Sequence, residues 1–157
     1  RLLAGYRSMR ELLDQEECLA LLRSALIEPS RQPVRESVRR LLDDAVDPMA
    51  ALVDVSRVRE ETFFGRTFAF ARHQDDSRAY LLHVVRCFYH QFAIANGVPE
   101  LMDVLCEWDW IWAEAIDPVT HGFSFELPTT LGYGGDVCRF CFRRLSGRDG
   151  GTLDHGR

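Results

Sequence analysis

The chain has 157 residues, of which 46% are hydrophobic and 27% charged, and this composition is typical of one globular domain. Its net charge of -5 is spread over both halves, so we expect no basic surface for nucleic acid. No apolar run approaches the roughly 20 residues that span a bilayer, and no leader peptide is visible, so we expect no membrane partner and a cytoplasmic location.

The first 62 residues are predicted to be helical. Apolar side chains at three- and four-residue steps indicate an amphipathic helix at the start of the chain. Asp14 and Glu17 have the spacing of a capping box, which would begin a second helix that Pro29 ends. Cys18 lies on the apolar stripe of this helix, and we expect it in the core, where free cysteine packs as a small hydrophobe.

Two further helix starts are marked by proline. Pro33 suits the first turn of a third helix, whose apolar face runs from Val34 to Ala45. Asp47 followed by Pro48 indicates a fourth helix that continues to about Arg59. We expect this helical part to be support for a site elsewhere in the chain.

Residues 63–145 change to the alternating pattern of strands. Segments 67–72 and 79–85, joined by a polar turn at 73–77, predict an antiparallel hairpin. Segments 122–127 and 137–142 alternate again, on either side of a glycine-rich bend.

A helix pair at about 87–116 is inserted between these two pairs of strands, with Asn96-Gly97 ending the first helix and Pro99 opening the second. The predicted fold class is α+β, in which N-terminal helices precede an antiparallel sheet of about four strands with the inserted helix pair. Because periodicity alone does not separate the strand at 79–85 from the start of a long helix, an all-helical fold is the alternative. We predict one domain over 1–157, ending in a flexible tail at 146–157.

Side chains that can act as thiolate, imidazole or carboxylate gather between Arg86 and Phe142. Cys87 is expected in the first turn of a helix, where the macrodipole and the neighbouring Arg86 would lower the pKa of its thiol. His90 follows three residues later on the same face, near enough to share a proton or a metal. The alternative is a half-buried cysteine beside a surface histidine.

Cys106 and Asp109 repeat the same spacing one helix later, among three tryptophans. A carboxylate that is buried among aromatic rings must be paired or hydrogen-bonded. We therefore expect Asp109 to be functional, and the alternative places it on the solvent face of the helix.

Cys138 and Cys141 lie three apart on a predicted strand, so they should point to opposite faces and not form a metal knuckle. A redox C-x-x-C motif would need a helix N-terminus, which the alternating phenylalanines argue against. One of the two is expected in the core. With five cysteines and no secretory context, free thiols or metal ligands are expected instead of disulfides.

An ordered set of short motifs in this half of the chain resembles the L-2-amino-thiazoline-4-carboxylic acid hydrolase family of bacteria, over about residues 78–144. The set comprises Cys87, then Gly97, Pro99, Glu100 and Leu101, then Cys106 and Asp109, and finally Phe125, Thr129 to Leu131, Gly134 to Asp136 and Cys138.

The resemblance implies the hydrolytic opening of a cyclic amidine. Water adds to C2 of a 2-aminothiazoline, and the ring C–N or C–S bond then breaks to give a carbamyl-cysteine. On this basis Asp109 is the amidinium partner or general base, and His90 is a proton shuttle. The candidates for nucleophile or metal ligand are Cys106, Cys87 and Cys138. The candidates for substrate binding are Thr130, Trp108 and Arg139.

Two alternatives stay open. Arg139 stands where the family usually has an acidic residue, so the chain is also considered as a biosynthetic tailoring enzyme that uses the same pocket on a related nitrogen-containing ring. From another class, it is considered as a non-enzymatic small-molecule or metal-binding module, although the cysteine spacings are not diagnostic of zinc or iron. We expect a small-molecule substrate and no cofactor, with zinc or iron as the exception. The metal set would be Cys87, Cys106 and Cys138 with His90 or Asp109.

Overall fold

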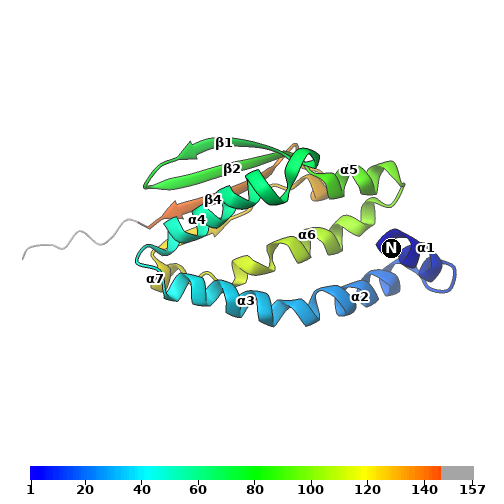
Figure 1. Cartoon of the computed structure of the whole chain (residues 1–157). Coiled ribbons are helices and arrows are strands. Elements are labelled where there is room, and N and C mark those ends of the chain that lie inside the picture. Colours follow the sequence, from blue (N-terminus) through cyan, green and yellow to red (C-terminus); the bar gives the residue numbers. More distant parts are fainter. Residues whose placement is uncertain (146–157) are drawn as a thin grey trace, which may run out of the picture.

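The computed structural model describes residues 1–145, which form seven α-helices and a four-stranded antiparallel sheet (Figure 1). The predicted α+β class and the hairpin are confirmed, and the tail predicted at 146–157 lies outside the described residues. The helices are α1 (Leu2–Arg10), α2 (Gln15–Leu26), α3 (Glu28–Asp43), α4 (Pro48–Val58), α5 (Phe88–Ala95), α6 (Met102–Trp110) and α7 (Pro118–His121). The strands are β1 (Ala69–Asp75), β2 (Ala79–Arg86), β3 (Phe123–Glu126) and β4 (Cys138–Arg144).

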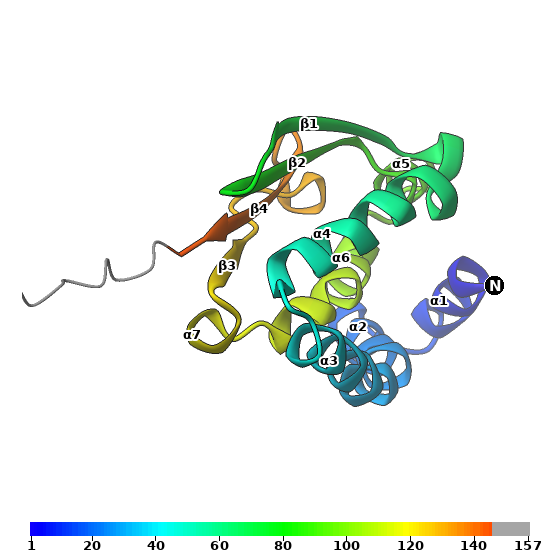
Figure 2. The same ribbon diagram turned by 60° about the vertical axis from the view of Figure 1, so that its left-hand side comes forward.

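The sheet has the order β1-β2-β4-β3 and presents one apolar face to the helices. Tyr80 pairs with Phe142 across β2 and β4, and Val84 pairs with Cys138. Since side chains alternate along a strand, these residues lie on the same face, and His83 lies on the other. Figures 1 and 2 show α4 and α6 between the sheet and a further layer made by α2 and α3.

Local signals placed most of the helix starts correctly. Asp14 and Glu17 form the predicted capping box of α2. Asp47 accepts a hydrogen bond from the backbone N–H of Ala50 at the start of α4. Each cap gives a partner to a backbone N–H that the first turn of a helix leaves unpaired.

The predicted start of α3 at Pro33 is wrong. Pro29, not Pro33, occupies the first turn, and Pro33 lies inside the helix. Only Ile27 separates α3 from α2, because this buried residue keeps a helical backbone and lets one helix follow the other. An interior proline removes one helical hydrogen bond, so packing of α3 against α4 and the segment Ile111–Ala115 must offset that loss.

The predicted turn at 73–77 is also too long. The strand β1 continues to Asp75, and the turn is closed by Asp76, whose carboxylate accepts hydrogen bonds from the backbone N–H groups of Arg78 and Ala79. Aspartate favours such local bonds to its own turn.

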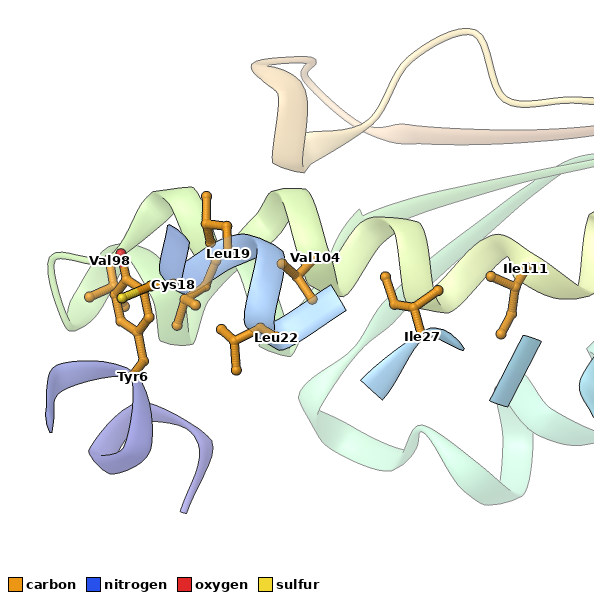
Figure 3. Packing of buried hydrophobic residues seen from close by; sticks show 9 residues of the cluster. Tyr6, Cys18, Leu19, Leu22, Ile27, Val98, Val104 and Ile111 are labelled. Carbon is orange, nitrogen blue, oxygen red and sulfur yellow. The ribbon is translucent and has the colours of Figure 1, made fainter. Parts of the chain in front are cut away.

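The helical layers share an apolar core that lies away from the sheet. Figure 3 shows Leu19 and Leu22 of α2 near Val104 of α6, and all three belong to one buried cluster. Cys18 is fully buried in this core, as predicted. Tyr6 adds a polar tie, because its hydroxyl donates to Glu100 Oε1 at 2.6 Å. None of the helices in residues 1–145 is both long and apolar enough to cross a membrane.

Candidate active site

A cavity of about 160 Å³ lies between the inner face of the sheet and helices α3, α4 and α6. Most of its lining is aliphatic or aromatic, with Phe70 and Phe140 from the sheet and Trp112 from the segment after α6. Cavities of roughly 150 Å³ accommodate one benzene ring. The volume therefore suits a single small ring with its substituents.

The structure brings four of the predicted site residues together in this cavity. Cys106 and Asp109 reach it from α6, Cys87 from the junction of β2 and α5, and Cys138 from the first position of β4. Because Cys138 pairs with Val84, its thiol lies near the end of β2. Residues separated by up to 51 positions thus meet because the sheet and α6 face each other.

The cavity thiols are held in their neutral form by burial. Burial raises the pKa of Cys106 to about 12 and that of Cys138 to about 11. Taking a thiol out of water disfavours the thiolate, and the nearby Asp109 carboxylate acts in the same direction. At neutral pH these side chains are thiols.

The predicted lowering of the Cys87 pKa is wrong. Cys87 is the N-cap of α5, and the backbone amides of Tyr89 and His90 do lower its pKa, but burial has the larger effect and raises it. The side chain of Arg86 donates to the backbone oxygen of Arg66 at 3.0 Å. Helix position alone therefore did not decide the state of this thiol.

Asp109 is a half-buried carboxylate in the lining of the cavity. Burial raises the pKa of its carboxyl, and the charge of Arg59 lowers it by less. Within residues 1–145 no hydrogen bond or ion pair to this carboxylate is present. Since the side chain is half-buried and has no protein partner in residues 1–145, its carboxylate is available to a cationic ligand that enters the cavity.

A second carboxylate, Glu60, lines the same cavity and was missed by the sequence analysis. It comes from a π-helical turn, Arg59–Phe63, that continues α4. Unlike Asp109 it is fully engaged: Arg72 Nε lies 2.9 Å away, and Ser56 and Tyr80 donate hydroxyl hydrogen bonds. Nothing in the sequence signals this network, because its members come from a helix, a π turn and two strands.

A polar groove of about 610 Å³ lies on the other side of α6. Glu107 in this groove binds Arg23 at 2.9 Å and Arg31 at 3.2 Å. Cys106 lines the groove as well as the cavity, so it stands at the boundary between them. Gly132 packs directly against it, since a Cβ at that position would lie 2.5 Å from Cys106 Sγ.

The other predicted site residues lie outside the cavity. His90 and Trp108 line neither the cavity nor the groove. Thr130 is buried, lines the groove, and accepts a hydrogen bond from the backbone N–H of Tyr133 at 3.2 Å. Arg139 lies on the opposite face of β4 from Cys138 and donates to the Asp136 carboxylate at 3.1 Å.

Cys141 is on the face of β4 opposite to Cys138, as the alternation predicted, and does not line the cavity. Among residues 1–145, no three His, Cys, Asp or Glu side chains are grouped so that they could hold a metal ion.

Comparison with known proteins gives one match. A family model described as L-2-amino-thiazoline-4-carboxylic acid hydrolase matches residues 2–142. No curated protein and no solved structure matches the chain. The family match confirms the resemblance seen in the sequence and extends it over the N-terminal helices, where no motif had indicated it.

Proposed function

Because the chain belongs to the L-2-amino-thiazoline-4-carboxylic acid hydrolase family, we propose that it uses water to open a small cyclic amidine in the cavity around Asp109. The observation that carries this proposal is the unpaired Asp109 carboxylate in an apolar cavity of about 160 Å³. An amidine is protonated at neutral pH, and one of its N–H groups can donate to one oxygen of a carboxylate while the other oxygen is left for a water. The cavity supplies such a carboxylate and has room for one ring.

Asp109 can serve both proton transfers of the ring opening. Its raised pKa makes it a stronger base than an exposed aspartate, so it takes a proton from the water whose oxygen adds to C2 of the ring. The ring C–N or C–S bond then breaks, and Asp109 returns the proton to the departing nitrogen or sulfur. The sum is one ring plus one water, giving an open-chain carbamyl product.

The thiols support a second, covalent route. In that route the thiolate of Cys106, Cys87 or Cys138 adds to C2, and the ring C–N or C–S bond breaks with protonation of the departing atom. Water then adds to the same carbon and displaces the cysteine as a thiol. Since burial raises the pKa of all three thiols, a bound cation would first have to stabilise the thiolate. We therefore assign the direct attack of water, and accumulation of a covalent adduct on one of these cysteines would favour the covalent route.

The test is turnover of 2-aminothiazoline-4-carboxylate by the purified chain, followed by mass spectrometry as the gain of one water. Asp109→Asn should lower kcat by roughly 10²- to 10⁴-fold, which is the usual contribution of a general base. Asp103→Asn is the matched control, because Asp103 is on the same helix but does not line the cavity. Equal activity of the Asp109→Asn variant and the wild type would rule out the role of Asp109.

Cyclic amidines with other rings should be assayed in parallel. Turnover of one of them, without turnover of the aminothiazoline, would identify a tailoring enzyme that uses the same cavity on another substrate. Absence of turnover for every ring would contradict the proposed activity itself.

A further inference from the structure

Arg59 is the only cation among the described residues that lines the cavity. The ion pairs present within residues 1–145 do not include it, although Arg57 and Arg72, close to it in the sequence, both bind carboxylates. The cavity carboxylate Glu60 is bound by Arg72 and not by its own neighbour Arg59. The guanidinium of Arg59 is therefore open to an anionic ligand.

The π-helical turn fixes the position of this guanidinium. The N–H of Phe64 donates to the carbonyl of Arg59 at 3.1 Å, five residues back along the chain. The wider turn brings the residues four and five positions ahead, Phe63 and Phe64, close to Arg59. Its guanidinium carbon accordingly lies 5.4 Å from the centre of the Phe63 ring and 5.3 Å from that of Phe64. These two cation–π contacts place the exposed side chain of Arg59 beside the cavity, and within residues 1–145 its guanidinium donates no hydrogen bond.

Arg59 and Asp109 form an electrostatic pair without touching each other. The charge of Arg59 lowers the pKa of both Asp109 and Tyr89, which also lines the cavity. No ion pair between Arg59 and Asp109 is present in the described part of the chain. A positive and a negative group thus line the same apolar cavity without an ion pair between them in residues 1–145.

We propose that Arg59 binds a carboxylate of the substrate, while Asp109 binds the amidinium at the other end of the same ring. The inference rests on the proposed function and deepens it. The ring carboxylate is already named in the family description, and the new assignment is that Arg59 selects rings with this anionic group over neutral or purely cationic amidines. Two opposite charges held at a fixed separation also orient the ring, so that C2 lies next to Asp109.

Three ligands distinguish the contact of Arg59 with the carboxylate from the contact of Asp109 with the amidinium. The first is 2-aminothiazoline-4-carboxylate, which carries both groups. The second is thiazoline-4-carboxylate, which carries only the anion, and the third is 2-aminothiazoline, which carries only the amidine. Their dissociation constants should be measured by calorimetry with the wild type and with Arg59→Met, Arg59→Lys and Asp109→Asn.

Arg59→Met should weaken binding of both carboxylate ligands by about ten- to a hundredfold, the range expected for a lost charge-assisted contact. It should leave binding of 2-aminothiazoline unchanged. Arg59→Lys should lie between Arg59→Met and the wild type, because lysine keeps the charge but not the planar fork. Asp109→Asn should show the reverse pattern and weaken only the amidine ligands.

Arg66→Met is the matched control, since Arg66 is exposed, lies seven residues along the chain and does not line the cavity. Equal losses for all three ligands in Arg59→Met would indicate a structural role, and a wild-type preference for the carboxylates in that variant would overturn the inference. Failure of the wild type to bind thiazoline-4-carboxylate would also overturn it. Arg59-dependent binding without turnover would instead contradict only the proposed activity.

Discussion

Asp109 links the stability of the protein to pH, because burial opposes its charge. The ordinary pKa of the group is 3.8, and its pKa in the folded protein is higher. Below the ordinary value the carboxyl is protonated in both the folded and the unfolded chain. As pH rises through the raised pKa, the folded protein must carry a charge that the unfolded chain solvates better, so stability falls.

Asp109→Asn should therefore raise the melting temperature at about pH 7, and the gain should vanish toward about pH 3, where wild type and variant are both uncharged at this position. The measurement is thermal unfolding of both proteins across that range of pH. A gain that is the same at every pH, or a loss at neutral pH, would show that the charge of Asp109 is compensated in the folded protein.

The five thiols should differ in their reaction with iodoacetamide. The thiolate is the reactive form, and burial raises the pKa of Cys87, Cys106 and Cys138 inside the cavity. Cys141 is less buried, on the other face of the sheet, and the charges of Arg143 and Arg139 partly offset the rise in its pKa. We expect Cys141 to be labelled first at neutral pH and the fully buried Cys18 last, as read by peptide mass mapping. Earlier labelling of a cavity thiol would contradict the raised pKa values.

At the scale of elements, the contact between α6 and the turn Leu131–Tyr133 sets one wall of the cavity. Gly132 makes this contact possible, because an added Cβ would lie 2.5 Å from Cys106 Sγ and 3.2 Å from Met102 Cβ. Either the turn or α6 must move to accept a larger residue. The cavity and the groove on either side of Cys106 would change shape together.

Gly132→Ala should reduce the free energy of unfolding by about 1–3 kcal/mol, the usual cost of overpacking. Removing the sulfur with Cys106→Ala should make the double variant more stable than the sum of the two single changes predicts. Gly5→Ala is the control, because that position in α1 is open and alanine favours a helix. Urea unfolding of the four variants measures these differences in the free energy of unfolding. If the effects of the two single changes add up to that of the double variant, a residue larger than glycine at position 132 does not clash with Cys106.

At the scale of the whole molecule, the sheet and the helices are joined by a buried polar network as well as by apolar packing. Glu60 on the π turn binds Arg72 on β1 and Tyr80 on β2. The side chain of Glu60 is 5% exposed and that of Arg72 is 35% exposed. In its degree of burial this ion pair is therefore intermediate between a buried pair and a surface pair. Burial and the Glu60 carboxylate both raise the pKa of Tyr80, which keeps its hydroxyl protonated.

Arg72→Met should destabilise the fold by about 2 kcal/mol, less than the loss of a fully buried partner, because solvent already screens Arg72. The double change with Glu60→Gln should recover part of this loss, since no buried charge is then left alone. Arg139→Met is the control, because its pair with Asp136 is exposed and should contribute less than about 1 kcal/mol. If thermal unfolding showed equal losses of stability for Arg72→Met and Arg139→Met, the buried Glu60 carboxylate would not need Arg72 to stabilise its charge.

The sequence by itself determined the features that depend on neighbouring residues. The capping box at Asp14, the helix start at Asp47 and the strand that carries Cys138 all follow from the preferences of a few adjacent positions. The same reasoning set Cys138 and Cys141 on opposite faces and Cys18 in the core. It also chose Cys87, His90, Cys106, Asp109 and Cys138 as one group, and the structure places all of them except His90 in one cavity.

Only the tertiary structure decided which groups surround each of these residues. The rise in the Cys87 pKa, the engagement of Glu60 and the free guanidinium of Arg59 depend on segments that are distant in the chain. The position of His90 outside the cavity depends on how α5 packs against α6, not on its spacing from Cys87. Burial and charge are sums over all neighbours in space, whereas spacing in a sequence reports only those on the same helix or strand.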